Sequence, residues 1–218
     1  MFFHDIRNTR GLVRDAITAL MIGVTSPCWI LAWLERRVSA SDELFTAFSQ
    51  LLSLIPGKSG VFVRRGYYAM TLDVFAWDAH LGFGTILAHR TVEIHRGVYI
   101  GARCMLGSVR IERDVTMGSN VDVLSGRHQH GFLELGKPIQ TQQGQFIQTT
   151  IARNCWIGNS AVIMADIGHD SVIGAGSVVV RPIPACVVAV GNPCATIRSR
   201  VQAEEPVVAR SDYANSKS

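Results

Sequence analysis

A six-residue repeat runs through the second half of the sequence and is clearest between Ile151 and Val179. Each block opens with an aliphatic residue, usually followed by Gly or Ala, and has a small residue four places after the aliphatic one. This period fits neither an amphipathic helix, with a period of about 3.6, nor an alternating strand, with a period of about 2. It predicts a chain that turns a corner every six residues, with aliphatic side chains pointing into a narrow interior.

The same register extends over roughly residues 78 to 195, where further blocks open with Leu81, Ile94, Ile100, Ile111, Met117 and Val123. Three sides make one triangular coil, and stacked coils bury a continuous core. The sequence therefore predicts a mainly β solenoid domain over residues 78–198. A helical segment over residues 1–77 precedes it, and a polar tail over residues 199–218, which we expect to be mobile, follows it.

The repeat is interrupted between Val123 and Ile151. The intervening residues are polar and contain glycines, and they show no block of the repeat. We predict a loop extruded from one corner over residues 125–150. A long loop in a compact solenoid is usually either functional or disordered.

Residues 16–34 contain no charged side chain, and Pro27 lies near their middle. A helix of this length would reach about 28 Å, close to the thickness of a bilayer core. Pro27 removes a helix hydrogen bond and should kink or break the segment. Arginines on both sides give no inside–outside asymmetry. The pattern favours a re-entrant or interfacial membrane helix; a full span and a soluble helix buried against another subunit are the alternatives.

Two further helices are expected before the repeat. Ser41, with acidic residues after it, is typical of a helix start, and Pro56 with Gly57 of its end. A second helix over residues 61–72 has basic and aromatic residues beside an apolar face: Arg64, Arg65, Tyr67 and Tyr68. These residues suit a membrane surface, and they equally suit a cap on the open first coil, which any solenoid requires.

The charge and the cysteines exclude several classes of function. The net charge of +4 is spread along the chain with acids among the bases, which argues against a nucleic-acid-binding stripe. Five cysteines include no CxxC pair, so we predict no metal site. Cys104 and Cys155 occupy inward small positions of the repeat, and reduced thiols in a cytosolic compartment explain them most simply.

Several motifs, in order, resemble those of hexapeptide-repeat acyltransferases, which fold as left-handed parallel β-helices. The stretch Val123-Leu-Ser-Gly-Arg-His128 is similar to the one that carries that family's catalytic histidine. Further matches follow over more than half of the chain: Gly136-Lys-Pro-Ile139, Trp156-Ile-Gly158, Gly174-Ala-Gly-Ser-Val-Val179, Ile183-Pro184 and Gly191-Asn-Pro-Cys194. The pattern looks most like acetyltransferases of bacterial exopolysaccharide clusters, of the colanic-acid type.

The resemblance implies an acetyl-CoA-dependent enzyme without a metal, in which His128 is the general base. Imidazole has a pKa near neutrality, so it can take the proton of an attacking hydroxyl. His130 would orient the acceptor or have no role, and the backbone N–H of Asn159 would stabilise the oxyanion. The residues expected at coenzyme A are Trp156, Gly158, Ala175, Gly176, Arg181, Asn192, Pro193 and Arg198.

The sequence also departs from the family. Val180 stands where relatives often have Thr, which puts one polar contact in doubt, whereas Arg181 keeps a positive charge for a phosphate. No acceptor-binding Asn can be placed on an earlier coil, so the acceptor site should differ from that of small-sugar acetyltransferases. The group that orients His128 is unassigned; Asp122 and Glu134 are near it in sequence.

In this family the active sites lie between the subunits of a trimer. We therefore expect a homotrimeric O-acetyltransferase of a sugar in a surface polysaccharide or its lipid-linked precursor, held at the cytoplasmic face of the bacterial inner membrane by residues 16–34. The alternatives are an N-acetyltransferase of an amino sugar, a zinc-dependent enzyme of the γ-carbonic-anhydrase type, which would need three histidines at a subunit interface, and a non-catalytic trimeric scaffold.

Overall fold

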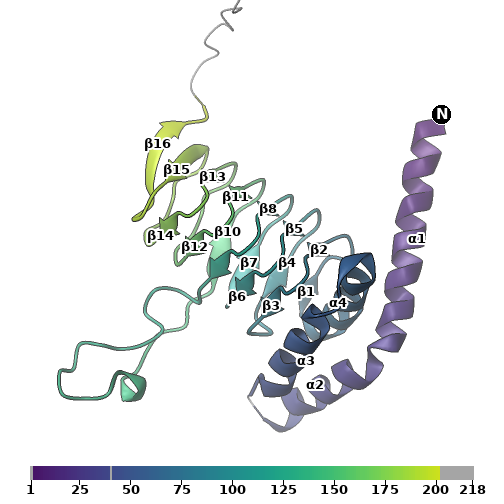
Figure 1. Cartoon of the computed structure of the whole chain (residues 1–218), viewed down its shortest axis with the longest axis horizontal. Helices are drawn as coiled ribbons and strands as arrows, with labels where there is room; N and C mark the ends of the chain where they lie inside the picture. Colours follow the sequence, from purple (N-terminus) through teal and green to yellow (C-terminus); the bar gives the residue numbers. More distant parts are fainter. Residues whose placement is uncertain (1, 40, 202–218) are drawn as a thin grey trace, which may run out of the picture.

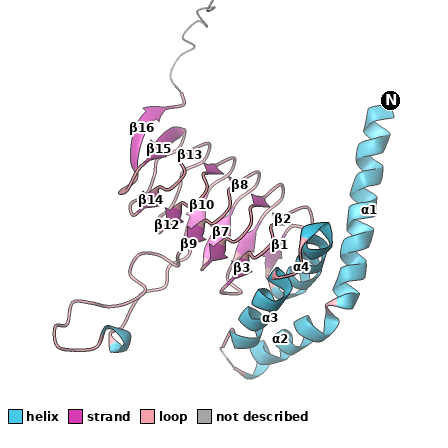
Figure 2. Ribbon diagram, in the orientation of Figure 1, coloured by secondary structure: helices cyan, strands magenta, loops and turns pink. Residues whose placement is uncertain are grey.

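In the computed structural model, which describes residues 2–39 and 41–201, short strands stack into the three flat walls of a triangular prism (Figures 1 and 2). Four helices cover the end of the prism at which the chain enters it, and one long loop leaves its side. Most of the predicted polar tail, residues 202–218, lies outside the described residues.

Each wall takes one strand from each successive coil. The first wall contains β1 (Val74–Phe75), β4 (Glu93–Ile94), β7 (Val109–Ile111) and β10 (Thr149–Ile151). The second contains β2 (His80–Leu81), β5 (Tyr99–Ile100), β8 (Thr116–Met117), β11 (Trp156–Ile157), β13 (Val172–Ile173), β15 (Val187–Val190) and β16 (Ala195–Ser199). The third contains β3 (Ile86–Leu87), β6 (Met105–Leu106), β9 (Asp122–Val123), β12 (Val162–Ile163) and β14 (Val178–Val179).

The described strands pair in parallel, except that β16 runs antiparallel to β15. Ile100, Met117 and Ile157 stack on one another inside the second wall, and all three are fully buried. Small residues of the repeat, such as Cys104 and Ser171, are buried at corners. The six-residue period is therefore confirmed as the length of one side of the prism.

A column of glycines forms the corner between the second and third walls. A Cβ on Gly158 would lie 2.4 Å from the backbone nitrogen of Ala175 in the next coil, and one on Gly101 would lie 2.6 Å from backbone atoms of Gly118. Only glycine lets successive coils approach this closely. Gly158 therefore has a structural reason to be glycine that is independent of any ligand.

The long loop leaves the third wall after β9 and returns at β10. Thr149 and Thr150, expected at its end, instead begin β10, because their backbones pair with Val109 and Arg110. The loop includes a short 3-10 helix, η1 (Ile139–Thr141). The buried side chain of Gln142 fastens it, since Nε2 donates to the carbonyls of Glu134 (2.9 Å) and Lys137 (3.0 Å).

The helices are α1 (Phe2–Val24), α2 (Ser26–Val38), α3 (Glu43–Ser53) and α4 (Gly57–Thr71). The break expected at Pro27 is confirmed, since Pro27 lies in the first turn of α2 and the pair bends by 66°. No single described helix is long and apolar enough to cross a membrane, but the bent pair Gly11–Val24 and Ser26–Val38 meets the length and composition criteria together. α4 packs against α1, α2, α3 and the first strands.

Helix α4 begins four residues earlier than the sequence predicts. The basic and aromatic residues expected on it, Arg64, Arg65, Tyr67 and Tyr68, are all buried. The Arg64 guanidinium donates to the carbonyl of Leu81, to those of Leu52 and Ser53 in the last turn of α3, and to that of Ile55 just after it. Arg65 donates to the carbonyl of Ala79 (2.6 Å). These residues cap the first coil, and the membrane-surface interpretation of them is wrong.

Candidate active site

His128 lies at the root of the long loop, where the outgoing and returning segments hydrogen-bond to each other. The Gln145 N–H donates to the carbonyl of His128 (2.7 Å), and the Ile147 N–H donates to that of Ser125 (3.1 Å). Between them, Gly126 has φ +78°, a conformation that glycine adopts without strain and that turns the chain outward. The loop root therefore fixes the backbone that carries His128.

The imidazole of His128 is exposed and contacts the preceding residue. Arg127 Nε donates to His128 Nε2 (2.8 Å), and Arg127 Nη1 reaches the carbonyl of Val180 (3.4 Å). Nε2 therefore accepts, which places the proton of the neutral ring on Nδ1. Of the two carboxylates near in sequence, Glu134 pairs instead with Lys137 (3.2 Å). His130 is exposed two residues further along the loop.

Asn159 lies at the corner between the second and third walls, in a column of residues whose backbone N–H groups point along the prism. The Ala102 N–H donates to Ser119 Oγ (3.1 Å), one coil further on. The Ser119 N–H in turn donates to Asn159 Oδ1 (3.0 Å). At this corner, each side-chain oxygen thus satisfies the backbone donor of the coil before it.

This ladder stops at Asn159. The next residue of the column is Ala175, which has no side-chain oxygen, and within the described chain the Asn159 N–H has no acceptor. Beside it, Gly176 has φ +69°, and a Cβ there would meet nothing within 4 Å. The corner thus offers an unpaired backbone donor next to open backbone, which is the arrangement that an oxyanion or a carbonyl ligand requires.

The other residues predicted to bind coenzyme A are spread over the second and third walls of the C-terminal coils. Trp156 is 58% exposed on the outer face of the second wall, so it is not an ordinary core aromatic. Arg198 is exposed on β16 of the same wall. Asn192 and Pro193 are exposed beside β14, because Val178 hydrogen-bonds to Gly191 and Cys194 on either side of them. Arg181 is exposed just after β14.

The structure places the predicted base and the predicted oxyanion donor at two different corners of the prism. His128 and Arg181 follow strands of the third wall, whereas Asn159, Ala175 and Gly176 precede strands of that wall. The third wall therefore separates the histidine from the unpaired N–H of Asn159 within one chain. A single chain does not bring the predicted base and the predicted oxyanion donor together by its topology.

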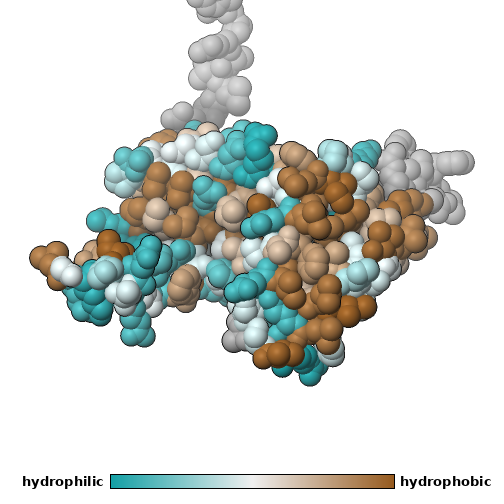
Figure 3. All heavy atoms as spheres, turned by 60° about the horizontal axis from the view of Figure 1, so that its bottom comes forward, coloured by the Kyte–Doolittle hydropathy of each residue, from teal (hydrophilic) through white to brown (hydrophobic). Residues whose placement is uncertain are grey.

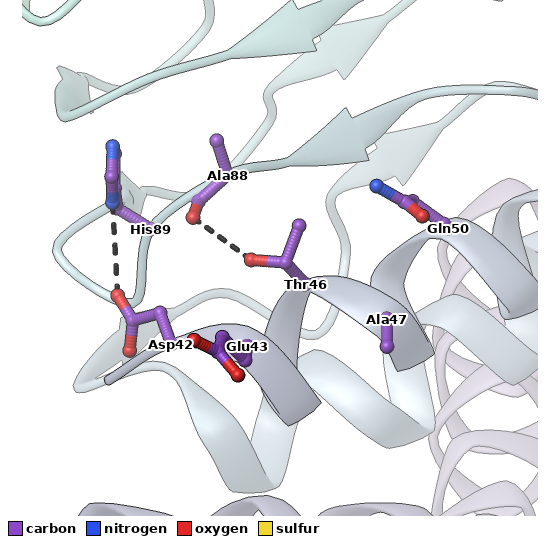
Figure 4. A pocket seen from close by; sticks show the side chains of 7 residues that line it. All are labelled: Asp42, Glu43, Thr46, Ala47, Gln50, Ala88 and His89. Atoms are coloured by element: carbon purple, nitrogen blue, oxygen red, sulfur yellow. Dashed lines mark hydrogen bonds and ion pairs between the residues drawn. The ribbon is translucent and has the colours of Figure 1, made fainter. Parts of the chain in front are cut away.

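A groove that no sequence motif indicates runs along the outer face of the third wall, between α3 and the root of the loop. At its α3 end, a pocket of about 540 Å³ is lined by Asp42, Thr46, Gln50 and His89, among others (Figure 4). His89 Nδ1 lies 3.7 Å from Asp42 Oδ2. His89 also lines an adjoining pocket with Gln129, the neighbour of His128. These residues come from three separate segments, so no local motif could reveal them.

Comparisons with known proteins show sequence similarity to acetyltransferases. A family model described as the hexapeptide repeat of succinyl-transferase matches residues 148–181. A Saccharomyces cerevisiae protein with an acetyltransferase name is 43% identical over 92 residues, which cover 41% of this chain and 45% of that protein. The galactoside O-acetyltransferase of Escherichia coli is 55% identical over 51 residues, or 22% of this chain and 25% of that enzyme. The chain thus spans less than half the length of these curated relatives.

Solved structures share the fold over a longer stretch. A maltose O-acetyltransferase from Clostridium difficile covers 71% of this chain and 84% of its own, with a TM-score of 0.63 and 21% identity. A hexapeptide-repeat acetyltransferase from Vibrio cholerae covers 76% of this chain and 96% of its own, with a TM-score of 0.59 and 20% identity. The expected left-handed β-helix with an N-terminal helical segment is confirmed. The chain therefore carries the hexapeptide repeat over residues 148–181 and shares the β-helix fold of these acetyltransferases.

Proposed function

We propose that this protein is an O-acetyltransferase that moves the acetyl group of acetyl-CoA to a sugar hydroxyl of a bacterial polysaccharide or its lipid-linked precursor. The observation that carries the proposal is the unpaired N–H of Asn159, because it stands where the family's oxyanion donor is expected. The names of the curated relatives, which include a galactoside O-acetyltransferase, support the choice of a sugar hydroxyl.

His128 acts as the base in this proposal. Its Nε2 takes the proton of the acceptor hydroxyl while the hydroxyl oxygen attacks the thioester carbonyl, and a positioned base of this kind contributes a factor of about 10²–10⁴. The carbonyl oxygen becomes an oxyanion that accepts the Asn159 N–H. The carbon–sulfur bond then breaks, and the imidazolium returns its proton to the departing thiolate. Arg127 has to leave Nε2 first, since its Nε occupies that lone pair.

The active site in this proposal lies between two copies of the chain in a homotrimer. The base and the oxyanion donor of one chain lie at different corners. His128 of one copy can therefore act together with the Asn159 N–H of a neighbouring copy. The loop that carries His128 also exposes large apolar side chains, with Leu133 86% and Leu135 98% exposed. Burial of these side chains against a second copy would remove apolar surface from water.

The bent helix pair is proposed to hold the enzyme at the cytoplasmic face of the bacterial inner membrane. Apolar side chains gather on the side of the molecule where the helices lie (Figure 3), and the exposed ones on this pair are Leu12, Val13, Leu20, Val24, Ile30, Leu31, Trp33, Leu34 and Val38. The Arg37 guanidinium lies 4.7 Å from the centroid of the Trp33 ring, a combination suited to a membrane–water interface. Because Ala32 is fully buried, the pair can present only one face to lipid, which favours interfacial binding.

Calorimetric titration of the purified protein with acetyl-CoA and CoA, followed by acetylation of p-nitrophenyl glycosides, tests this function. We expect about one binding site per chain and a loss of turnover of about 10²–10⁴ in His128→Ala with little change in acetyl-CoA affinity. His130→Ala, two residues away on the same exposed loop, is the matched control and should retain turnover. Absence of acetyl-CoA binding, or full turnover in His128→Ala, would overturn the proposal.

A further inference from the structure

The corner between the first and second walls changes composition at the C-terminal end of the prism. The later coils turn this corner with one non-glycine residue in the left-handed conformation, which Asp114, Asn154, Asp170 and Cys186 adopt with φ of 62°, 56°, 58° and 58°. Asp and Asn occupy this conformation readily, because their short polar side chains bond locally, whereas Cys has no such advantage. Cys186 therefore stands at a backbone position that favours other residues.

The residue before it in each coil changes as well. Arg113 and Arg153 precede Asp114 and Asn154, and each pairs with a nearby carboxylate of the left-handed column. In the next coil the arginine is replaced by His169, and in the last one the left-handed residue is Cys186. At the end of the solenoid, a histidine therefore replaces the arginine of this corner, and a cysteine replaces the Asp or Asn.

These replacements bring three metal-ligand atoms together. His169 Nδ1 lies 2.7 Å from Asp170 Oδ2 and 3.9 Å from Cys186 Sγ, and the three ligand atoms lie within 4.8 Å of one another. All three side chains are partly buried. Ligands at the usual zinc distances, about 2.0 Å to N or O and 2.3 Å to S, are separated by about 3.3–3.6 Å in a tetrahedron. The observed cluster needs only small side-chain movements to reach this arrangement.

We propose that His169, Asp170 and Cys186 form a binding site for a divalent zinc-class metal ion, with one position left for water. A nitrogen, a carboxylate oxygen and a thiolate sulfur together suit Zn²⁺ and Co²⁺ better than Mg²⁺ or Ca²⁺. Binding replaces the hydrogen bond between His169 and Asp170 and releases the thiol proton of Cys186 to solvent. No oxidation step is involved.

The neighbours of the cluster fit this assignment. Asn154 Nδ2 donates to Asp170 Oδ1, which leaves Oδ2 turned toward His169 and orients it as an outer partner of a ligand does. Arg153 Nη2 lies 3.7 Å from the same Oδ2, but its side chain is 41% exposed. Such an exposed ion pair contributes little, so the divalent ion displaces the guanidinium into solvent.

The position of the site indicates a structural role. His169 and Asp170 precede β13, and Cys186 precedes β15, the strand on which the antiparallel β16 closes the second wall. The Arg200 N–H also donates to the carbonyl of Cys186 (2.7 Å). An ion here ties the last coils together, at an end that a solenoid has to cap. His128 and the unpaired N–H of Asn159 lie at the other two corners.

Cobalt titration of the full, reduced chain after chelator treatment tests the site. We expect one equivalent of Co²⁺ to give a near-ultraviolet thiolate-to-cobalt charge-transfer band together with tetrahedral visible bands, and Zn²⁺ to abolish both. Cys186→Ser should remove the charge-transfer band. Cys194→Ser, which alters another partly buried thiol, should retain it. Zn²⁺ should also raise the Tm of the wild type but not of Cys186→Ser.

A second variant keeps the test decisive if Cys186→Ser folds poorly. His169→Gln keeps the thiol and should weaken Co²⁺ binding at least about tenfold, while circular dichroism reports whether the fold is kept. Absence of a charge-transfer band in the wild type would overturn the proposal. A band that survives Cys186→Ser but disappears in Cys194→Ser, or unchanged affinity in a folded His169→Gln, would do so as well.

Discussion

The guanidinium of Arg90 and the carboxylate of Glu35 form an ion pair in which the side chains are only 8% and 7% exposed. Arg90 follows β3, whereas Glu35 belongs to α2, so the pair joins the prism to the helices. Arg90 also contacts Asp42 Oδ1 (2.6 Å), and Glu35 accepts the N–H of Leu44 (2.7 Å) at the start of α3. One buried pair therefore fixes α2, α3 and the first coil relative to one another.

We expect Arg90→Met to lower the free energy of unfolding by about 3–5 kcal/mol, because it leaves Glu35 as a buried charge without its partner. The double variant Arg90→Met/Glu35→Gln should be less destabilised than Arg90→Met, since the uncompensated charge is removed. Urea denaturation of the three proteins measures both effects. Lys137→Met, which breaks an exposed pair with Glu134, is the control and should change stability by less than about 1 kcal/mol. Equal stability of the single and double variants would contradict the prediction.

Ala175 controls whether the N–H of Asn159 is free. In the earlier coils, the Ala102 N–H donates to the hydroxyl of Ser119, which stands one coil further on. A serine at position 175 would stand in the same relation to Asn159, and its hydroxyl would accept the Asn159 N–H. We expect Ala175→Ser to lower kcat by about 10²-fold, since removal of an oxyanion donor costs about 10²–10³. Ala175→Gly leaves the donor free and should stay close to wild type.

Separate measurement of kcat and of KM for acetyl-CoA distinguishes this effect from a steric one. A hydroxyl that only obstructs the ligand raises KM, whereas a hydroxyl that occupies the oxyanion donor lowers kcat. A rise in KM with unchanged kcat in Ala175→Ser would refute this role of the N–H.

The sequence could predict the solenoid because the face of each residue in a hexapeptide follows from its place in the period. The same logic could not reveal the role of the Asn159 side chain. Its partner Ser119 precedes it by 40 residues, with the extruded loop between them, and only the stacking of coils brings the two together. The pairing of Arg90 with Glu35 could not be predicted either, because the two residues are 55 positions apart and belong to different parts of the fold.

Arg64 and Arg65 show a different limit. Sequence pattern indicates that a helix carries cations beside an apolar face, but it does not indicate whether the cations meet lipid headgroups or backbone carbonyls. The open end of the first coil decides the question, because its carbonyls need donors. The interpretation therefore depends on tertiary structure that no local motif contains.

The hydrogen bond from Arg127 to His128 predicts an unusual response to mutation. Because Arg127 Nε occupies the lone pair that would accept the hydroxyl proton, Arg127→Met should keep kcat at or above the wild-type value. His128→Ala should instead lower kcat by about 10²–10⁴. Steady-state kinetics at saturating acetyl-CoA compare the two variants. A fall in kcat for Arg127→Met as large as that for His128→Ala would show that Arg127 orients the base rather than competing for it.

His80 predicts a dependence of stability on pH. Its ring stacks on Tyr99, with centroids 4.5 Å apart, and burial lowers the pKa of His80, with smaller contributions from the nearby cations Arg65 and Arg64. Between its folded pKa and its unfolded value of about 6.5, the unfolded chain binds more protons than the folded one. His80 should therefore make the Tm fall as the pH drops below about 6.5.

Thermal unfolding of wild type and His80→Phe between about pH 7.5 and 5.5 measures this contribution, over a range in which carboxylates with ordinary or lowered pKa stay ionised. Phe keeps an aromatic ring against Tyr99 but cannot bind a proton, so the variant should lose part of the fall in Tm. His130→Phe, at an exposed loop position, should keep the wild-type slope. If His80→Phe and wild type lose stability in parallel as the pH falls, the titration of His80 is not coupled to folding, and the stacked ring serves packing alone.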